Sequence, residues 1–145
     1  MHKILYIGAD HAGHGLKEAL KKVLTDEADW VLEDLTPDFE AGDDYPLVAQ
    51  KLAKLVARNP GSRGILSCGS GVGVTMAANR IKGVRAFDAF DGQTVKLARE
   101  HNDANVIAFS GWRQKPAEAK KLLELFLKTK APTAGRHVRR VKQLG

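Results

Sequence analysis

Short apolar runs alternate with stretches of helical periodicity along the whole chain, and this alternation constrains the fold more than any other feature. The runs are typical of buried strands, while the stretches between them repeat apolar residues every three or four positions, as helices do. A chain of 145 residues with this pattern predicts a single α/β domain over 1–145. We expect a three-layer, Rossmann-like fold, in which helices cover both faces of a five-stranded parallel sheet. The expected strands are 3–8, 30–35, 64–67, 84–89 and 104–109, and the expected helices cover about 16–24, 46–58, 74–80, 92–100 and 116–128.

The residues with distinctive chemistry directly follow the expected strands. Asp10 and His11 come after the first strand, Cys68 comes after the third, and Arg113 comes after the fifth. In a sheet of this kind, ligands bind beyond the carboxyl ends of the strands. The sequence therefore predicts a ligand site at that edge.

Cys68 is the only cysteine, and it precedes a glycine-rich segment, 69–73, that leads into a helix. The G-x-G-x-G spacing differs from the dinucleotide fingerprint G-x-G-x-x-G, and no Gly-Lys-Ser/Thr follows as in a P-loop. Backbone amides at a helix N-terminus favour an anion, which suits a thiolate base, an oxyanion formed in a reaction, or both. The alternative is that Cys68 is a small buried apolar residue, which is the commoner role of a lone cysteine.

Two histidine-containing segments have both a functional and a structural interpretation. Asp10 and His11 offer an acid–base group and an imidazole that can bind phosphate, but Asp10 can also simply cap the first helix. His101 and Asn102 lie at a helix end before the fifth strand, where His101 can transfer a proton or cap the helix. Neither segment decides the function by itself.

The positive charge is concentrated at the C-terminus. The net charge is +6, and all of the excess lies beyond Glu124, mostly in a basic tail over 130–145. On a helix, Arg136 and Arg140 would share one face and grip one phosphate together. A solvated basic tail is the structural alternative. A nucleic-acid-binding segment is another, although the tail contains no Phe, Trp or Tyr and no nucleic-acid motif is recognisable.

The remaining composition indicates a cytoplasmic protein. No apolar run reaches the roughly 20 residues of a membrane span, so no membrane association is expected. The first strand begins almost at Met1, without a signal-peptide pattern. One cysteine cannot form an internal disulfide, which fits a reducing compartment.

Six segments, taken together, resemble the ribose-5-phosphate isomerase B family, also called the RpiB/LacA/LacB sugar-phosphate isomerases. The segments occur in the family's order and cover nearly the whole chain. They are Gly8-Ala9-Asp10-His11-Ala12-Gly13, Asp44-Tyr45-Pro46, Cys68-Gly69-Ser70-Gly71-Val72-Gly73, Ala77-Ala78-Asn79, His101-Asn102-Asp103-Ala104-Asn105-Val106 and Gly135-Arg136-His137.

This resemblance implies an aldose–ketose isomerase that needs no cofactor and no metal. The reaction implied is the interconversion of D-ribose 5-phosphate and D-ribulose 5-phosphate through a cis-enediolate. By position, Cys68 matches the catalytic base of the family's cysteine-bearing branch, and His101 and Asp10 match residues implicated in opening the furanose ring. The other matches are the oxyanion loop of Gly69, Ser70, Gly71, Val72 and Gly73, the phosphate grip of His11, Arg113, Arg136 and Arg140, and the sugar-pocket residues Tyr45 and Asn102.

The resemblance also implies a homodimer, or a tetramer, with shared active sites. His101 and part of the arginine cluster are then expected from the partner subunit, and either Arg139 or Arg140 can reach the phosphate. The substrate stays open at this point: a six-carbon sugar phosphate (allose 6-phosphate or galactose 6-phosphate) or a rare free sugar is the alternative. A different class of function, a non-catalytic module that binds phosphometabolites or RNA through the basic tail, also remains open.

Overall fold

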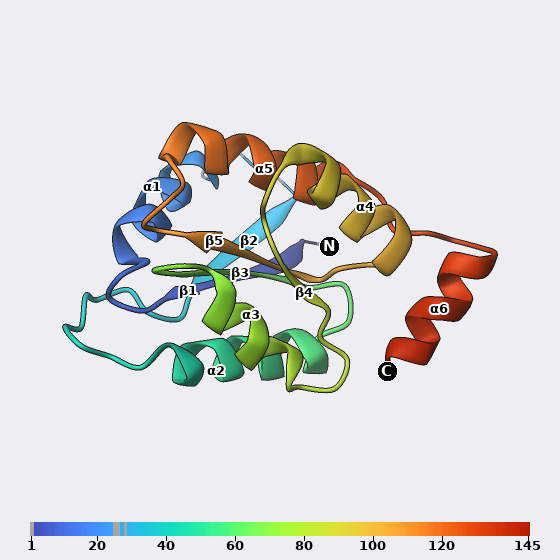
Figure 1. The fold of residues 1–145 in the computed structure, drawn as a ribbon, viewed down its shortest axis with the longest axis horizontal. Coiled ribbons are helices and arrows are strands. Elements are labelled where there is room, and N and C mark those ends of the chain that lie inside the picture. Colours follow the sequence, from blue (N-terminus) through green and yellow to red (C-terminus); the bar gives the residue numbers. More distant parts are fainter. Residues whose placement is uncertain (1, 25–26, 28) are drawn as a thin grey trace.

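A twisted sheet of five parallel strands forms the centre of the molecule (Figure 1). The computed structural model describes residues 2–24, 27 and 29–145. The strands and helices alternate along the chain, which confirms the predicted α/β class. In chain order they are β1 (Lys3–Ala9), α1 (His14–Leu24), β2 (Trp30–Asp34), α2 (Tyr45–Arg58), β3 (Arg63–Cys68), α3 (Val72–Asn79), β4 (Ala86–Asp88), α4 (Gly92–Asn102), β5 (Val106–Ser110), α5 (Pro116–Lys128) and α6 (Arg136–Leu144).

The strand order β2-β1-β3-β5-β4 determines where a ligand can bind. The chain moves outward from β1 to β2 and then returns to the other side of β1 with β3. The loops that leave β1 and β3 therefore diverge to opposite faces of the sheet, and a crevice opens between them at the carboxyl ends of these strands. Asp10 and Cys68 lie at the ends of these two neighbouring strands.

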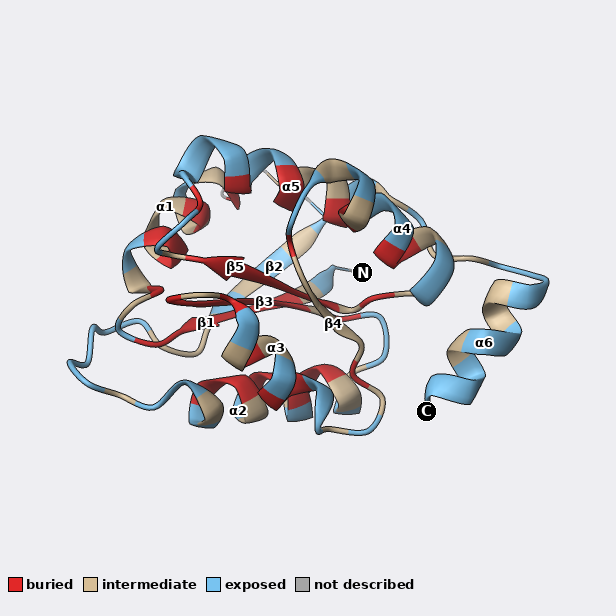
Figure 2. Cartoon of the chain, in the orientation of Figure 1, coloured by how far each residue is buried: buried red, intermediate tan, exposed pale blue. Residues whose placement is uncertain are grey.

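Each face of the sheet has its own apolar core. Helices α1, α4 and α5 cover one face, and α2 and α3 cover the other, as Figure 1 shows. Most residues of the central strands β1, β3 and β5 are buried, as expected when helices cover both faces of a parallel sheet (Figure 2), while the edge strands β2 and β4 are only partly buried or exposed. Phe109 of β5 and Phe126 of α5 are fully buried in the first core, while Leu52 of α2 and Leu66 of β3 are fully buried in the second.

Two strands and one tail differ from their predicted form. The fourth strand is shorter than 84–89 because the amide of Arg85 donates to the side chain of Asn105 and not to a neighbouring strand. The fifth begins only at Val106, since the amide of Ala104 donates to Ala98 and ties this residue to the end of α4. Residues 136–144, expected as part of a basic tail, form helix α6.

Helix α6 packs against α4 at the edge of the molecule and contains no buried residue. In Figure 2 it projects from the edge of the molecule, coloured only as intermediate (tan) or exposed (pale blue). None of the helices in the described ranges is long and apolar enough to cross a lipid bilayer.

Gly13 allows the start of α1 to approach β3 closely. A Cβ atom at Gly13 would lie 2.2 Å from the carbonyl oxygen of Ser67 and 2.6 Å from its hydroxyl oxygen. These atoms belong to a central strand and cannot move away at small cost. Gly15, two residues later in α1, is exposed, and a Cβ atom built on it would have no atom within 4 Å.

We therefore expect opposite effects from alanine at these two positions. Gly13→Ala should lower the free energy of unfolding by about 2–3 kcal/mol, because α1 must shift away from β3. Gly15→Ala should leave it unchanged or raise it by up to about 1 kcal/mol through helix propensity. Urea unfolding of both variants measures the difference, and equal stability of the two would contradict the close approach.

Candidate active site

A cavity of about 240 Å³ opens where β1 and β3 end. Four segments that are distant in sequence form its walls: the loop after β1, the start of α2, the loop after β3, and the loop after β5. Seven of the predicted site residues line it, together with Ala12 and Trp112. The seven are Asp10, His11, Tyr45, Cys68, Gly69, Ser70 and Gly73.

Cys68 is at once part of the core and part of the cavity wall. Its side chain is 4% exposed and packs in the apolar core between the sheet and helices α2 and α3. Its Sγ accepts a hydrogen bond of 3.2 Å from the amide of Gly71. Cys68 is therefore a small buried side chain, as its structural interpretation predicts. It also lines the cavity at the predicted ligand site, so the two interpretations do not exclude each other.

The glycine-rich loop is fixed to β5 and leads into α3. The carbonyl oxygen of Gly69 accepts hydrogen bonds from the hydroxyl of Ser110 (2.7 Å) and from the amide of Trp112 (3.1 Å). Gly71 adopts φ +82°, which glycine tolerates, and is the N-cap of α3. The first turn of α3 has amides without partners inside the helix, so this turn can bind an anion. Gly71 and Val72 belong to the loop but do not line the cavity.

Asp10 is held in the cavity wall by its own loop. It is 6% exposed, and its carboxylate accepts a hydrogen bond of 3.0 Å from the amide of Gly13, immediately before α1. This hydrogen bond is the structural role that the sequence suggested for Asp10, at the start of α1. It also fixes the carboxylate beside the cavity.

His11 is held by Asp43, a residue of the β2–α2 loop. Its Nδ1 lies 3.0 Å from Oδ1 of Asp43, and this hydrogen bond raises the pKa of His11 above its usual value. The negative charge of Asp10 acts in the same direction, while partial burial of the ring acts against both. The imidazolium form of His11 therefore persists to higher pH than in an isolated histidine.

Four other predicted residues lie away from this cavity, around α4 and α6. His101 of α4 stacks on His137 of α6, with ring centroids 4.0 Å apart and an interplanar angle of 7°. Partial burial, with the nearby charges of His101 and two arginines, lowers the pKa of His137. Asn102 lines a different cavity, together with Leu144. The predicted residues of this group are His101, Asn102, Arg136 and Arg140.

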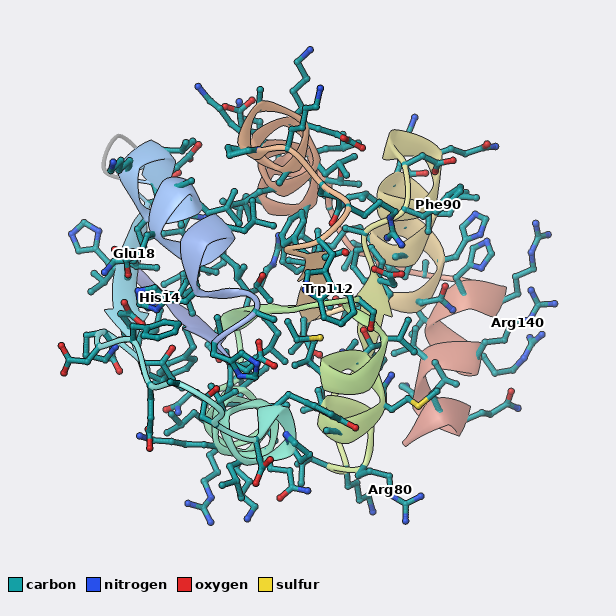
Figure 3. The ribbon with its side chains drawn as sticks, turned by 60° about the vertical axis from the view of Figure 1, so that its left-hand side comes forward. His14, Glu18, Arg80, Phe90, Trp112 and Arg140 are labelled. Atoms are coloured by element: carbon teal, nitrogen blue, oxygen red, sulfur yellow. The ribbon has the colours of Figure 1, made fainter. Side chains whose placement is uncertain are left out.

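Arg140 projects outward from α6, apart from Trp112, whose indole covers the loop after β3 (Figure 3). Arg113, next to Trp112, also does not line the Cys68 cavity. Its guanidinium lies 3.7 Å from the carboxylate of Asp88, whose pKa is raised by burial and lowered in part by this arginine. One chain thus brings together the thiol, the acid and one phosphate-binding candidate, but not the arginines.

Sequence reasoning missed two residues of the site, Trp112 and Asp43, as functional candidates. Trp112 follows the fifth strand directly, which is the position that identified its neighbour Arg113. Asp43 belongs to an acidic loop whose contacts depend on the fold.

Within the described ranges, no group of three or more His, Cys, Asp or Glu side chains is arranged to hold a metal ion.

Comparison with known proteins gives a consistent result along nearly the whole chain. A family model described as Ribose/Galactose Isomerase matches residues 5–144. A probable ribose-5-phosphate isomerase B of Mycoplasma pneumoniae is 40% identical over 99% of this chain and 94% of its own length.

Two solved structures show the same fold. Type B ribose 5-phosphate isomerase of Trypanosoma brucei superposes with a TM-score of 0.94 at 34% identity, covering 99% of this chain and 97% of that one. Ribose-5-phosphate isomerase B of Mycoplasma genitalium with bound ribulose-5-phosphate gives 0.91 at 39% identity, covering 99% and 95%.

The indole of Trp112 should respond to a change at Gly69. A Cβ atom at Gly69 would lie 2.4 Å from two carbons of the indole, so Gly69→Ala must displace the ring, which is 78% exposed and free to move. We expect a changed fluorescence emission with little loss of stability. Gly92→Ala is the control, because its Cβ would make an ordinary contact of 3.6 Å. An unchanged emission spectrum of Gly69→Ala would mean that the indole of Trp112 does not lie against Gly69 in solution.

Proposed function

This chain belongs to the ribose/galactose isomerase family, and we propose that it interconverts D-ribose 5-phosphate and D-ribulose 5-phosphate with Cys68 as the base. The observation that carries this proposal is the position of the Cys68 thiol in a cavity that it shares with Asp10, His11 and the glycine-rich loop. Relatives of Mycoplasma and Trypanosoma are named as ribose-5-phosphate isomerases, which supports a five-carbon over a six-carbon sugar phosphate.

The reaction moves one proton between adjacent carbons. The Cys68 thiolate removes the proton from C2 of the open-chain aldose, and the electron pair of that bond forms the C1–C2 double bond of a cis-enediolate. As that double bond forms, the C1 carbonyl pair moves onto the oxygen of C1. The same thiol then returns its proton to C1, and the hydroxyl proton on the oxygen of C2 passes to the oxygen of C1, so that C2 becomes the ketone carbon and C1 carries a hydroxyl. C1 is reduced as C2 is oxidised, so no external electron acceptor is required.

The loop after β3 supplies the stabilisation that the enediolate needs. The proton on C2 is only weakly acidic, so the negative charge on oxygen must be stabilised as it forms. Fixed N–H donors in such a loop are typically worth about 3 kcal/mol each in a transition state. We assign this role to the loop of Gly69–Gly73 and to the hydroxyl of Ser70; Gly69, Ser70 and Gly73 line the cavity with Cys68.

Ring opening and phosphate binding require residues that one chain does not gather. Asp10 lies in the cavity wall, but His101, Asn102, Arg136 and Arg140 lie around α4 and α6. We infer a homodimer in which α4 and α6 of one subunit complete the Cys68 cavity of the other. His101 then assists ring opening, and the arginines, with His11, bind the phosphate.

A lone cysteine without a disulfide partner also fits a cytoplasmic location.

Removal of the thiol tests the base directly. Cys68→Ala should lower kcat for ribose 5-phosphate isomerisation by about a thousandfold, which is the order of magnitude that a positioned general base contributes. Ser67→Ala is the matched control: it removes a buried hydroxyl without a hydrogen-bond partner one residue earlier and should keep near-normal turnover. Wild-type turnover by Cys68→Ala would exclude Cys68 as the base.

Complementation between two inactive variants tests the shared site. Cys68→Ala and Arg136→Ala are each expected to be inactive, and they are unfolded and refolded together. A mixed dimer with shared sites contains one site with both residues intact, so activity should return to about a quarter of the wild-type value. If each site is built within one chain, every site in the mixed dimer has a defect and no activity returns.

A further inference from the structure

Asp43 holds His11 by three hydrogen-bond contacts from a loop that is distant in sequence. Its Oδ1 accepts from the backbone amide of His11 at 2.7 Å and lies 3.0 Å from the ring Nδ1. The carbonyl oxygen of Asp43 lies 3.3 Å from the same Nδ1. Asp43 therefore fixes both the backbone and the imidazole ring of His11, which lines the Cys68 cavity.

These contacts determine which ring nitrogen carries a proton. A carboxylate and a carbonyl oxygen only accept hydrogen bonds, so Nδ1 must be the donor, whether the ring is neutral or charged. In the neutral ring, Nε2 is then an acceptor and cannot donate to a phosphate oxygen. In the imidazolium, Nε2 is a donor with a positive charge.

We propose that Asp43 is a positioning residue for substrate binding: it orients His11 and fixes its tautomer, so that Nε2 binds the phosphate only when it is protonated. The phosphate is the one on ribose 5-phosphate, so this inference rests on the function proposed above. Asp43 itself touches neither the reacting atoms nor the phosphate.

The loop that carries Asp43 is anchored independently of His11. At its start, Lys17, which is fully buried, donates to the carbonyl oxygen of Thr36, and the hydroxyl of Thr36 accepts a hydrogen bond of 3.0 Å from the amide of Ala9. In the middle, the ring of Phe39 meets His14 of α1 edge-on, with centroids 5.5 Å apart. Asp43 is therefore presented to His11 by an already fixed loop.

The charges around His11 favour the protonated ring. Asp43 and Asp10 face it as carboxylates, and the hydrogen bond to Asp43 is the largest cause of its raised pKa. The other titratable side chains that line the cavity are Tyr45 from α2 and Cys68 from β3; no lysine or arginine of the described residues lines it. Within one chain, His11 is therefore the cation that the cavity offers to a phosphate.

Asp43→Asn removes the charge and retains an acceptor oxygen of the same shape. At about pH 7.5, where a sugar phosphate is a dianion, we expect KM for ribose 5-phosphate to rise about tenfold, with kcat within about twofold. The sign follows from the raised pKa: without the charge of Asp43 the pKa of His11 falls, so the imidazolium is lost at lower pH. The increase in KM should therefore shrink as pH is lowered toward about 6.

Two further variants separate charge, geometry and non-specific effects. Asp43→Ala also removes the acceptor, so its KM should stay raised at both pH values. Asp38→Asn removes a carboxylate from an exposed position of the same loop and should change neither KM nor its pH dependence. Thermal unfolding of each variant checks that the fold is retained.

Histidine NMR titration gives a readout that does not depend on turnover, with the His11 signal assigned by its loss in His11→Asn. The pKa of His11 should be lower in Asp43→Asn than in wild type, and inorganic phosphate should shift the His11 signal at lower concentration in wild type. If wild type does not isomerise ribose 5-phosphate, the proposed function fails, while these NMR results still test the role of Asp43. An unchanged His11 pKa, or an unchanged KM in an active enzyme, would overturn the role of Asp43.

Discussion

The close approach of the β1–α1 loop to the ends of β3 and β5 is the constraint on which the site depends. Gly13 lies against the carbonyl of Ser67, and a Cβ atom at Gly111 would lie 2.4 Å from the carbonyl oxygen of Ala12. The amide of Asp10 donates to the same Ser67 carbonyl at 3.3 Å. Because these backbones touch, the acid of one loop and the thiol of the next strand share a single cavity. A larger side chain at either glycine would separate the walls.

Much of the fold could be predicted from the sequence, because buried strands and amphipathic helices have different periods. The edges of elements were less predictable where a side chain competes with a backbone partner. Asn105 is the clearest example: its side chain accepts a hydrogen bond from the amide of Arg85 and donates one to the carbonyl oxygen of Gly83, and this shortens β4. The strand order was also not predicted, since periodicity identifies strands but says nothing of their neighbours.

The candidate site could be predicted only where chemistry and chain position coincide. Cys68 and Asp10 follow strands directly, so the topology alone places them together. Asp43 lies 32 residues from His11 and has no motif of its own, so only the folded loop shows its partner. The converse case is His101, whose chemistry was evident but whose position beside α6 separates it from Cys68 in the same chain. A sequence gives the residues of a site without saying how many chains build it.

The distribution of charge gives a physical reason for the proposed division of the site between two subunits. Arg136, Arg140, His101 and His137 gather on α4 and α6, and their mutual repulsion is one cause of the lowered pKa of His137. The repulsion within a cluster of positive charges on an exposed helix is unfavourable, and a bound anion reduces it. The Cys68 cavity, by contrast, has carboxylates around its one imidazole cation. A sugar phosphate placed between the two surfaces would satisfy the basic helix with its phosphate, while its carbon chain reaches the thiol. Substrate binding and subunit association would then stabilise each other.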